Sequence, residues 1–335
     1  MKRLLLFCMA ALAVCAGMLY WGVMPDEFYE FVDTYAPLPV SGAIQGVGQE
    51  RGGAAAVASP APPREALALP GEADPEEFPD IAQRVIDGVL AMEEGIRVPV
   101  LFPEGDDDEI TDHLLRQVEL AIDVIRREKP EIFWLSLGSY NIEWSGSRES
   151  RIGALTVYLS YCHTPREVER LSGEMRELAK ILVAAAPNPP AESLAFFHDW
   201  IVENTAYATY IAERRASMRG YEYGFNIDGV FVKGSAVCEG YTKAFKLLCD
   251  LAGIPCRIVY GIADGENHSW NYVQLDGNWY LVDVTWDDPV SEQDLLLHEY
   301  FLKGSESEID GRPVRAIYRE DGAVYPALAP TGYYE

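Results

Sequence analysis

The fold is decided by one stretch, Gly234 to Pro289, which reads GSAVCEGYTKAFKLLCDLAGIPCRIVYGIADGENHSWNYVQLDGNWYLVDVTWDDP. From Cys238 onward, apolar side chains recur at helical spacing until Gly253 and Pro255, residue types that end helices. The pattern therefore predicts a helix that begins at or beside Cys238. The partial positive charge at a helix N-terminus stabilises a thiolate, which is the nucleophilic form of cysteine.

Three strands are predicted after this helix, at Arg257–Gly261, His268–Leu275 and Asn278–Trp286. The last two are separated by Asp276-Gly277, and an Asp-Gly pair between alternating runs is a strong hairpin signal. We therefore expect a two-residue loop that pairs Leu275 with Asn278.

That register gathers a histidine and an aspartate on one face of the sheet. His268 faces Thr285 and Trp270 faces Asp283, so Asp283 lies diagonal to His268. Diagonal neighbours lie roughly 7–8 Å apart at the backbone, a gap that an imidazole and a carboxylate can close. A slip of one residue would turn Asp283 to the opposite face.

Cys238, His268 and Asp283 are the residue types of a nucleophilic triad. The thiolate attacks an acyl carbon, the imidazole exchanges the proton, and the carboxylate fixes the imidazole tautomer. Taken singly, each residue has an ordinary alternative: half of a disulfide, a satisfied polar core residue, or a turn cap. The shared strand face and the helix start favour the catalytic interpretation of the three together.

The same stretch resembles the core of the transglutaminase-like superfamily. The likeness is carried by VCEGYTKAFKLL, GIPCRIVYG and HSWNYVQLDGNWYLVDVTWDDP, and more weakly by FFHDWIVENTAY upstream. The resemblance implies an α+β fold with a papain-like core, in which the helix bearing Cys238 packs on an antiparallel sheet bearing His268 and Asp283. It implies Cys238 as nucleophile, His268 as base and acid, and Asp283 as orienting residue. Members act as transglutaminases, peptidases or related amidases, and some have lost activity.

Three functional hypotheses follow from the resemblance and the triad. The first is a cysteine hydrolase, a peptidase or amidase that acts on peptide or protein amide bonds; we rank it first because water is always present. The second is a protein-crosslinking acyltransferase, in which a lysine amine resolves the acyl-enzyme. The third is an inactive cell-surface binding or scaffold domain. The chemistry requires no cofactor. We assign Trp270, which shares the face of the triad, and Tyr241, on the predicted helix, as substrate-binding residues.

Composition limits the class of protein and of partner. A chain of 335 residues with 49% hydrophobic content can bury a full core. The formal net charge of −26 makes nucleic acid an unfavourable partner, because phosphate backbones repel it. The expected partners are a protein or peptide substrate and, through the N-terminal segment, a membrane.

Cysteine and histidine spacing indicates no metal site. Two of the six cysteines, Cys8 and Cys15, lie in the apolar N-terminal run. Cys249 and Cys256 are either bridged or small buried hydrophobes. The five histidines form no zinc-ligand spacing. His198 is interpreted as a packed or exposed helical residue.

The N-terminus predicts an export segment. Residues 1–24 carry Lys2 and Arg3 before a long apolar run, which favours an uncleaved membrane anchor over a cleaved signal peptide. The basic end places the rest of the chain outside the cytoplasm, so that the protein is membrane-anchored or secreted. Residues 25–77 form a linker rich in Pro, Gly and Ala.

Residues 78–233 are predicted to support the catalytic core at 234–330. Periodicity predicts helices near 81–92, 114–125, 168–182 and 194–201, and strands near 97–102, 130–137 and 154–162. Thr164 begins an N-cap, proline and capping-box pattern for the third helix. The acidic run Asp106 to Glu109 suits either calcium or a helix N-terminus, and we favour the helix. The tyrosine-rich segment Tyr207 to Tyr223 is either core or part of a substrate groove.

Overall fold

The computed structural model describes residues 80–136, 140–213, 220–290 and 295–335. Every described residue belongs to one compact unit, Gly46–Glu335. The predicted anchor and linker lie outside the described residues. Within the described ranges, no helix has both the length and the apolar character that a membrane span needs.

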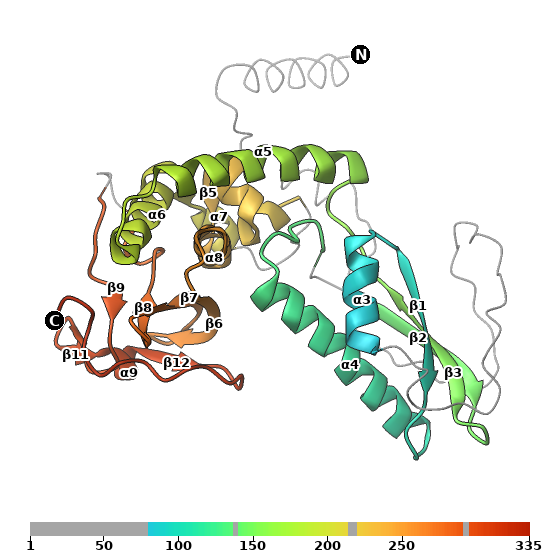
Figure 1. Cartoon of the computed structure of the whole chain (residues 1–335). Helices are drawn as coiled ribbons and strands as arrows, with labels where there is room; N and C mark the ends of the chain where they lie inside the picture. The colour runs from blue at the N-terminus through green and yellow to red at the C-terminus, as the bar shows by residue number, and fades with distance from the viewer. Residues whose placement is uncertain (1–79, 137–139, 214–219, 291–294) are drawn as a thin grey trace, which may run out of the picture. The chain divides into compact units, whose positions relative to one another are not determined.

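The first part of the described chain combines helices with a small antiparallel sheet of order β1-β3-β2. Its elements are α3 (Ile81–Leu90), β1 (Gly95–Leu101), α4 (Asp107–Glu128), β2 (Asn141–Ser147) and β3 (Ile152–Tyr158). Figure 1 shows α3 and α4 side by side next to this sheet. Asp106 caps α4 through a capping box with Glu109, so the acidic run begins a helix as we favoured.

Two predictions for this part differ from the structure. The strand expected at 130–137 is wrong, because its described residues, 130–136, form one isolated bridge, Leu135 to Tyr161, while their apolar side chains are buried in the core. Strand β2 was not predicted. It alternates weakly and is largely exposed, so it carries little of the period-2 pattern that marks a half-buried strand.

A group of helices follows, and it forms one wall of the core. They are α5 (Pro165–Ala185), α6 (Pro190–Asn204) and the short α7 (Thr209–Ala212), then η2 (Glu222–Phe225) and η3 (Gly229–Lys233). Thr164 caps α5 in a capping box with Glu167, and Pro165 opens the helix, as the sequence predicts. Between these helices, β4 (Ala206–Tyr207) pairs in parallel with β5 (Ser235–Ala236).

The second part is a five-stranded antiparallel sheet of order β12-β6-β7-β8-β9, which α8 (Cys238–Ala252) packs against. Its strands are β6 (Cys256–Ala263), β7 (Glu266–Leu275), β8 (Asn278–Val282), β9 (Phe301–Lys303) and β12 (Tyr318–Glu320). Helix α8 lies between β6 and β7 on one side and α5 and α6 on the other (Figure 1). The remaining elements are β10 (Glu308–Ile309), β11 (Arg312–Pro313) and α9 (Val314–Ile317). The α+β prediction is confirmed.

The central hairpin has the predicted register. Leu275 pairs with Asn278, and the pairing continues to Asn271 with Val282. Asp276 and Gly277 both have positive φ, 50° and 82°, as a type I′ turn requires. A second Asp-Gly pair, at Asp264 and Gly265, also has two positive φ angles, 47° and 91°, and joins β6 to β7.

Strand β8 ends four residues earlier than predicted, at Val282. The Asp283 carboxylate accepts the Trp286 N–H at 3.2 Å, which bends the chain into a turn. Thr285 therefore lies in that turn, and the prediction that it faces His268 on a strand is wrong. Asp283 itself is still held to the sheet, because its N–H donates to the Tyr300 carbonyl at 3.0 Å.

Candidate active site

Cys238 is the first residue of α8, with Val237 as N-cap. Its backbone carbonyl accepts the Thr242 hydroxyl at 2.5 Å, and Thr242 in turn contacts the Ser269 hydroxyl of β7 at 3.0 Å. The first turn of α8 is therefore tied to the strand that carries His268. Cys238 is a half-buried free thiol, and it lines a surface cavity of about 580 Å³ together with His268.

His268 and Asp283 form a close pair. Their Nε2 and Oδ2 atoms are 2.7 Å apart, and the two side chains are only 7% and 1% exposed. Burial lowers the pKa of His268, but the charge and hydrogen bond of Asp283, with smaller contributions from Cys238, raise it to about 10. Because Nε2 is engaged by the carboxylate, Nδ1 is the ring nitrogen that is left for another partner. The structure thus brings the three predicted triad residues together.

The Asp283 carboxylate has two further donors. The Tyr318 hydroxyl donates to Oδ2 at 2.9 Å, and the Trp286 N–H donates to Oδ1. Tyr318 begins β12, the edge strand beside β6. Sequence reasoning missed it, because it lies 35 positions beyond Asp283 in a segment without a recognisable motif. These donors fix the orientation of the carboxylate.

Aromatic rings enclose the histidine. The rings of His268 and Trp286 are stacked with centroids 4.9 Å apart, and Trp270 is stacked at 6.1 Å. Tyr318 packs against both tryptophans, at 4.8 Å from Trp270 and 5.2 Å from Trp286. This apolar surround limits the rotation of the imidazole and strengthens its attraction to Asp283.

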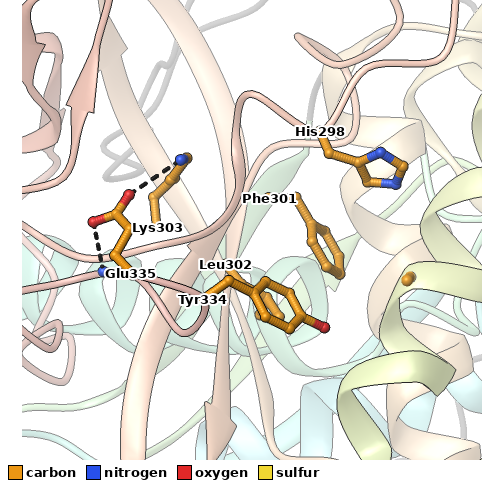
Figure 2. A pocket seen from close by; sticks show the side chains of 8 residues that line it. His298, Phe301, Leu302, Lys303, Tyr334 and Glu335 are labelled. Carbon is orange, nitrogen blue, oxygen red and sulfur yellow. Dashed lines mark hydrogen bonds and ion pairs between the residues drawn. The ribbon is translucent and has the colours of Figure 1, made fainter.

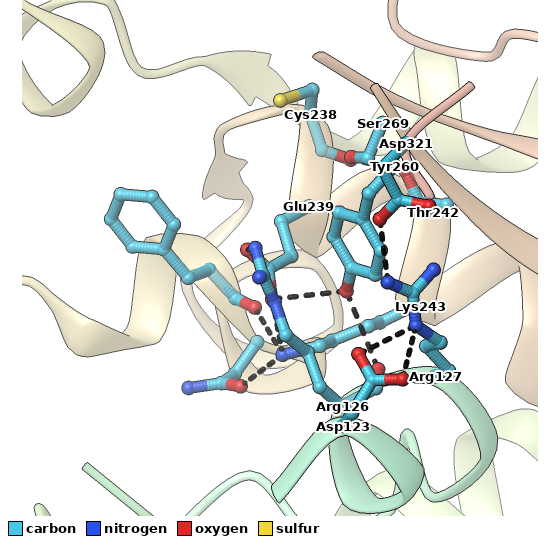
Figure 3. Close-up of polar contacts among 12 residues, drawn as sticks. Asp123, Arg126, Arg127, Cys238, Glu239, Thr242, Lys243, Tyr260, Ser269 and Asp321 are labelled. Carbon is cyan, nitrogen blue, oxygen red and sulfur yellow. Dashed lines mark hydrogen bonds and ion pairs between the residues drawn. The ribbon is translucent and has the colours of Figure 1, made fainter. Parts of the chain in front are cut away.

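The residue after Cys238 anchors the helix from the other side. Glu239 is buried and receives two hydrogen bonds from Arg126 of α4, at 3.0 and 2.9 Å, and one from the Tyr260 hydroxyl at 3.1 Å. Lys243 lies 3.0 Å from the same carboxylate. Burial raises the pKa of Glu239, but the charges and hydrogen bonds of Lys243 and Arg126 outweigh it and lower the pKa to about 2. Figure 3 shows this cluster directly beside Cys238.

Tyr207 lies beside the segment that leads into Cys238. It pairs with Ala236 on the short ladder between β4 and β5, two positions before Cys238. Burial, followed by the charges of Cys238, Glu266 and Asp283, raises the pKa of Tyr207 to about 12. Its phenol therefore stays protonated at neutral pH and can donate a hydrogen bond. The tyrosine-rich composition of the segment was the sequence signal for it.

Neither predicted substrate-binding residue lines the cavity. Trp270 is 1% exposed and packs between β7 and Tyr318, whereas Tyr241 is fully buried. The Tyr241 hydroxyl donates within the core, with the Thr205 carbonyl at 3.1 Å and the Asp288 carboxylate at 2.5 Å. The geometry gives both residues a packing role beneath the site. The cavity is lined instead by a mixed surface of charged, polar and apolar residues, which includes Arg126, Phe225, Ile262, Asn267, Arg319, Glu320 and Asp321.

The other described cysteines are free thiols. Cys249 and Cys256 are both buried, and burial together with the neighbouring Cys256 thiol raises the pKa of Cys249 well above the usual value. The structure thus agrees with the second of the two alternatives, small buried hydrophobes. Cys162 is half-buried, and burial raises the pKa of its thiol to about 12. None of these three combines accessibility with a stabilised thiolate.

Parts of the chain are similar to known proteins. Human (Homo sapiens) kyphoscoliosis peptidase is 35% identical over 82 residues, which cover 19% of this chain and 12% of that protein. The crystal structure of a TGase has a TM-score of 0.33 at 17% identity, covering 57% of this chain and 52% of the other. The periplasmic domain of TgpA from Pseudomonas aeruginosa has a TM-score of 0.27 at 20% identity, covering 43% and 62%. Residues 176–284 match the family model described as the transglutaminase-like superfamily, and this part of the chain therefore belongs to that superfamily.

Proposed function

We propose that the protein is a cysteine hydrolase that cleaves peptide or protein amide bonds through an acyl-enzyme on Cys238. The observation that carries the proposal is the His268–Asp283 pair, 2.7 Å apart and buried, against a free thiol at a helix N-terminus. Each feature favours a thiolate paired with an imidazolium. The superfamily membership of residues 176–284 supports the same reaction class.

The proposed reaction has two steps. The Cys238 sulfur bonds to the substrate carbonyl carbon, and the carbon–nitrogen bond breaks as the leaving amine takes the proton of the His268 imidazolium. Water then gives a proton to His268 while its oxygen bonds to the acyl carbon, and the carbon–sulfur bond breaks. The acid product leaves, and the thiolate is restored. Asp283 keeps the imidazole oriented throughout.

The developing oxyanion needs hydrogen-bond donors. The backbone N–H of Cys238 is one, because N–H groups in the first turn of a helix have no intrahelical acceptor. We infer that the Tyr207 phenol is the second. The observations that support it are its position on β4 beside the Cys238 segment and the electrostatic influence of Cys238 on its hydroxyl.

We also propose that the domain acts outside the cytoplasm. The support is the basic residues and the apolar run within residues 1–24, which predict an export segment. Protease accessibility of the domain in intact cells tests this placement. Degradation only after cell lysis would contradict it.

The activity is tested with a library of fluorescent peptides, with products analysed by mass spectrometry. We expect the wild type to hydrolyse peptides and Cys238→Ala to lose this activity. Cys162→Ala should keep the activity, because Cys162 is a half-buried cysteine outside the site. Added hydroxylamine should trap the acyl-enzyme as a hydroxamate. Amine incorporation without hydrolysis would assign the crosslinking reaction instead. A folded wild type that yields neither product would leave the scaffold hypothesis.

A further inference from the structure

A second cluster of histidines and carboxylates lies outside the triad. His198 of α6 is fully buried, and its Nδ1 is 2.9 Å from Asp199 Oδ1. The same Oδ1 is 2.7 Å from Nε2 of His298, a residue that precedes β9. The other nitrogen of His198, Nε2, is 3.1 Å from Asp287 Oδ2, and Asp287 is also fully buried. The two imidazole rings are stacked, with centroids 4.9 Å apart.

These contacts demand a cation. Both nitrogens of His198 face carboxylate oxygens, and a neutral imidazole has only one N–H to donate. Either the ring is protonated, or a metal ion replaces the proton between His198 and Asp199. Among the described residues, the ion pairs of Asp199 and Asp287 are with histidines alone, so no lysine or arginine compensates the two carboxylates. Asp287 is buried, and a buried, uncompensated carboxylate is strongly unfavourable.

We propose that His198, Asp199 and His298 form a binding site for one divalent transition-metal ion of the zinc class. One ligand atom from each residue can be chosen so that all three lie within 4.8 Å of one another. Two imidazole nitrogens and one carboxylate oxygen are a ligand set that zinc accepts, whereas calcium prefers oxygen ligands only. The inference does not rest on the proposed function, because none of these residues belongs to the triad.

Asp287 supplies the support that such sites need. A metal-bound histidine usually donates its other ring N–H to a carboxylate, which fixes the tautomer and the ring orientation. Asp287 occupies that place toward His198 Nε2. Its own carboxylate is held by the Tyr300 N–H, at 3.0 and 3.3 Å. The three proposed ligands, His198, Asp199 and His298, therefore have a supporting carboxylate, Asp287, in place.

The open side of the cluster reaches the surface. His298 is 42% exposed and Asp199 36%, so solvent has access to their ligand atoms. His298 also lines a cavity of about 350 Å³. Figure 2 shows His298 and Phe301 on one side of this cavity and the Lys303–Glu335 ion pair on the other. A fourth ligand, water or a group of a bound molecule, can enter from this side.

Residue spacing does not indicate such a site, because its ligands come from distant segments. Asp199 and His298 are 99 positions apart, and the adjacent pair His198-Asp199 has no metal-ligand spacing of its own. Bound metal would join α6 to the segment before β9. Asp287 connects this cluster to the active site, since its N–H donates to the Asp283 carbonyl at 3.2 Å.

The test is a titration of the metal-free full-length chain with Zn²⁺ and Co²⁺. A Cys238→Ala background removes the active-site thiol as a competing ligand. We expect one equivalent to bind, with visible Co²⁺ absorption bands but without a sulfur-to-cobalt charge-transfer band. Asp199→Asn and His298→Gln should each weaken binding at least tenfold. Both side chains are partly exposed, so the two variants should remain folded.

His113→Gln, a histidine of α4 outside the cluster, is the matched control and should bind as the parent does. Zn²⁺ should also raise the melting temperature of the parent and of this control, but not of His298→Gln. Absence of stoichiometric binding would overturn the proposal and leave a protonated His198 as the cation. Binding that is unchanged in both ligand variants would equally overturn it, because the metal would then lie elsewhere.

Discussion

Replacing Asp283 with asparagine tests the electrostatic basis of the site. Asp283→Asn removes the charge that lies 2.7 Å from His268 while keeping the size of the side chain. The pKa of His268 is about 10, against an ordinary value of 6.5. This difference in pKa corresponds to about 5 kcal/mol in favour of the imidazolium. Burial opposes this rise, so Asp283 and Cys238 together produce all of it.

Asp283 contributes the larger part, because its charge and hydrogen bond precede those of Cys238 among the causes. We therefore expect Asp283→Asn to lower the pKa of His268 by about 2 units or more. The imidazolium of the variant would then be lost near pH 8 or below, while that of the wild type persists to about pH 10.

The assay compares two alkylating reagents on Cys238 by peptide mass spectrometry. Iodoacetate is an anion that the imidazolium attracts, whereas iodoacetamide is neutral, so the ratio of their rates reports the charge on His268. In the wild type, Cys238 should be alkylated at acidic pH, where an ordinary thiol is almost fully protonated. The iodoacetate preference should disappear near pH 10 in the wild type and near pH 8 or below in Asp283→Asn.

The control is Asp264→Asn, which removes a surface carboxylate paired with Arg312 and should leave the wild-type profile unchanged. Equal profiles for Asp283→Asn and the wild type would refute the reasoning, because Asp283 would then not set the charge of His268. A wild-type Cys238 that is inert at acidic pH would refute the ion pair itself.

The same pKa shift predicts how stability depends on pH. The folded state raises the pKa of His268 above its unfolded value, so the resulting stabilisation is fully present below about pH 6.5 and is lost as the pH rises through about 10. Between pH 6 and 10, the difference in unfolding free energy between wild type and Asp283→Asn should therefore shrink. Urea unfolding at fixed pH values measures it, and a difference that grows toward pH 10 would contradict the sign.

Three further substitutions test individual contacts. Glu239→Gln should cost about 3–5 kcal/mol in urea unfolding at pH 7, because it leaves buried cations without their carboxylate; the cost should vanish as the pH falls from 4.5 through about 2, because the folded state lowers the pKa of Glu239. Tyr318→Phe removes a hydrogen bond to the charged Asp283 and should lower the unfolding free energy by about 1.5–3 kcal/mol in the same assay. Tyr207→Phe should lower kcat about a hundredfold in peptide hydrolysis and leave the alkylation rate of Cys238 unchanged.

Each of these variants has a matched control on the surface. Glu177→Gln breaks an exposed pair with Lys180, and Tyr334→Phe changes a tyrosine that is 68% exposed. Both controls should have the same unfolding free energy as the wild type, because exposed ion pairs and hydroxyls contribute little to stability. A Glu239→Gln variant as stable as its control would show that the buried carboxylate is not needed. Parallel losses of kcat and of Cys238 alkylation in Tyr207→Phe would indicate a structural role for the phenol.

The central hairpin could be predicted because its determinants are local. Asp276-Gly277 fixes the loop length, the loop length fixes the register, and the register brings Asp283 next to His268. Asp264-Gly265 carries the same signal and specifies the β6–β7 hairpin equally well. The helix start at Cys238 was likewise predictable, from periodicity and from the terminating Gly253.

The supports of the site could not be predicted, because they are contacts between distant segments. Arg126 and Glu239 are 113 positions apart, and neither periodicity nor spacing relates them. The burial of Trp270 and Tyr241, which we expected to bind substrate, could not be predicted for a similar reason. A shared strand face or helix places a side chain near a site, but only the packing of neighbouring elements decides whether that side chain is exposed there.

The polar contacts around Cys238, His268 and Asp283 hold the geometry that the proposed reaction needs. A reacting sulfur and its base must stay within about 0.5 Å of the productive arrangement. Thr242 ties the first turn of α8 to β7, and Glu239 ties the same turn to α4. Tyr318 fixes Asp283 independently from β12. These anchors come from three different elements, β7, α4 and β12. Loss of one contact should therefore increase the mobility of the residue that it holds and leave the other two contacts in place. The contacts of Thr242, Glu239 and Tyr318 therefore add to the direct His268–Asp283 pair in positioning the three residues.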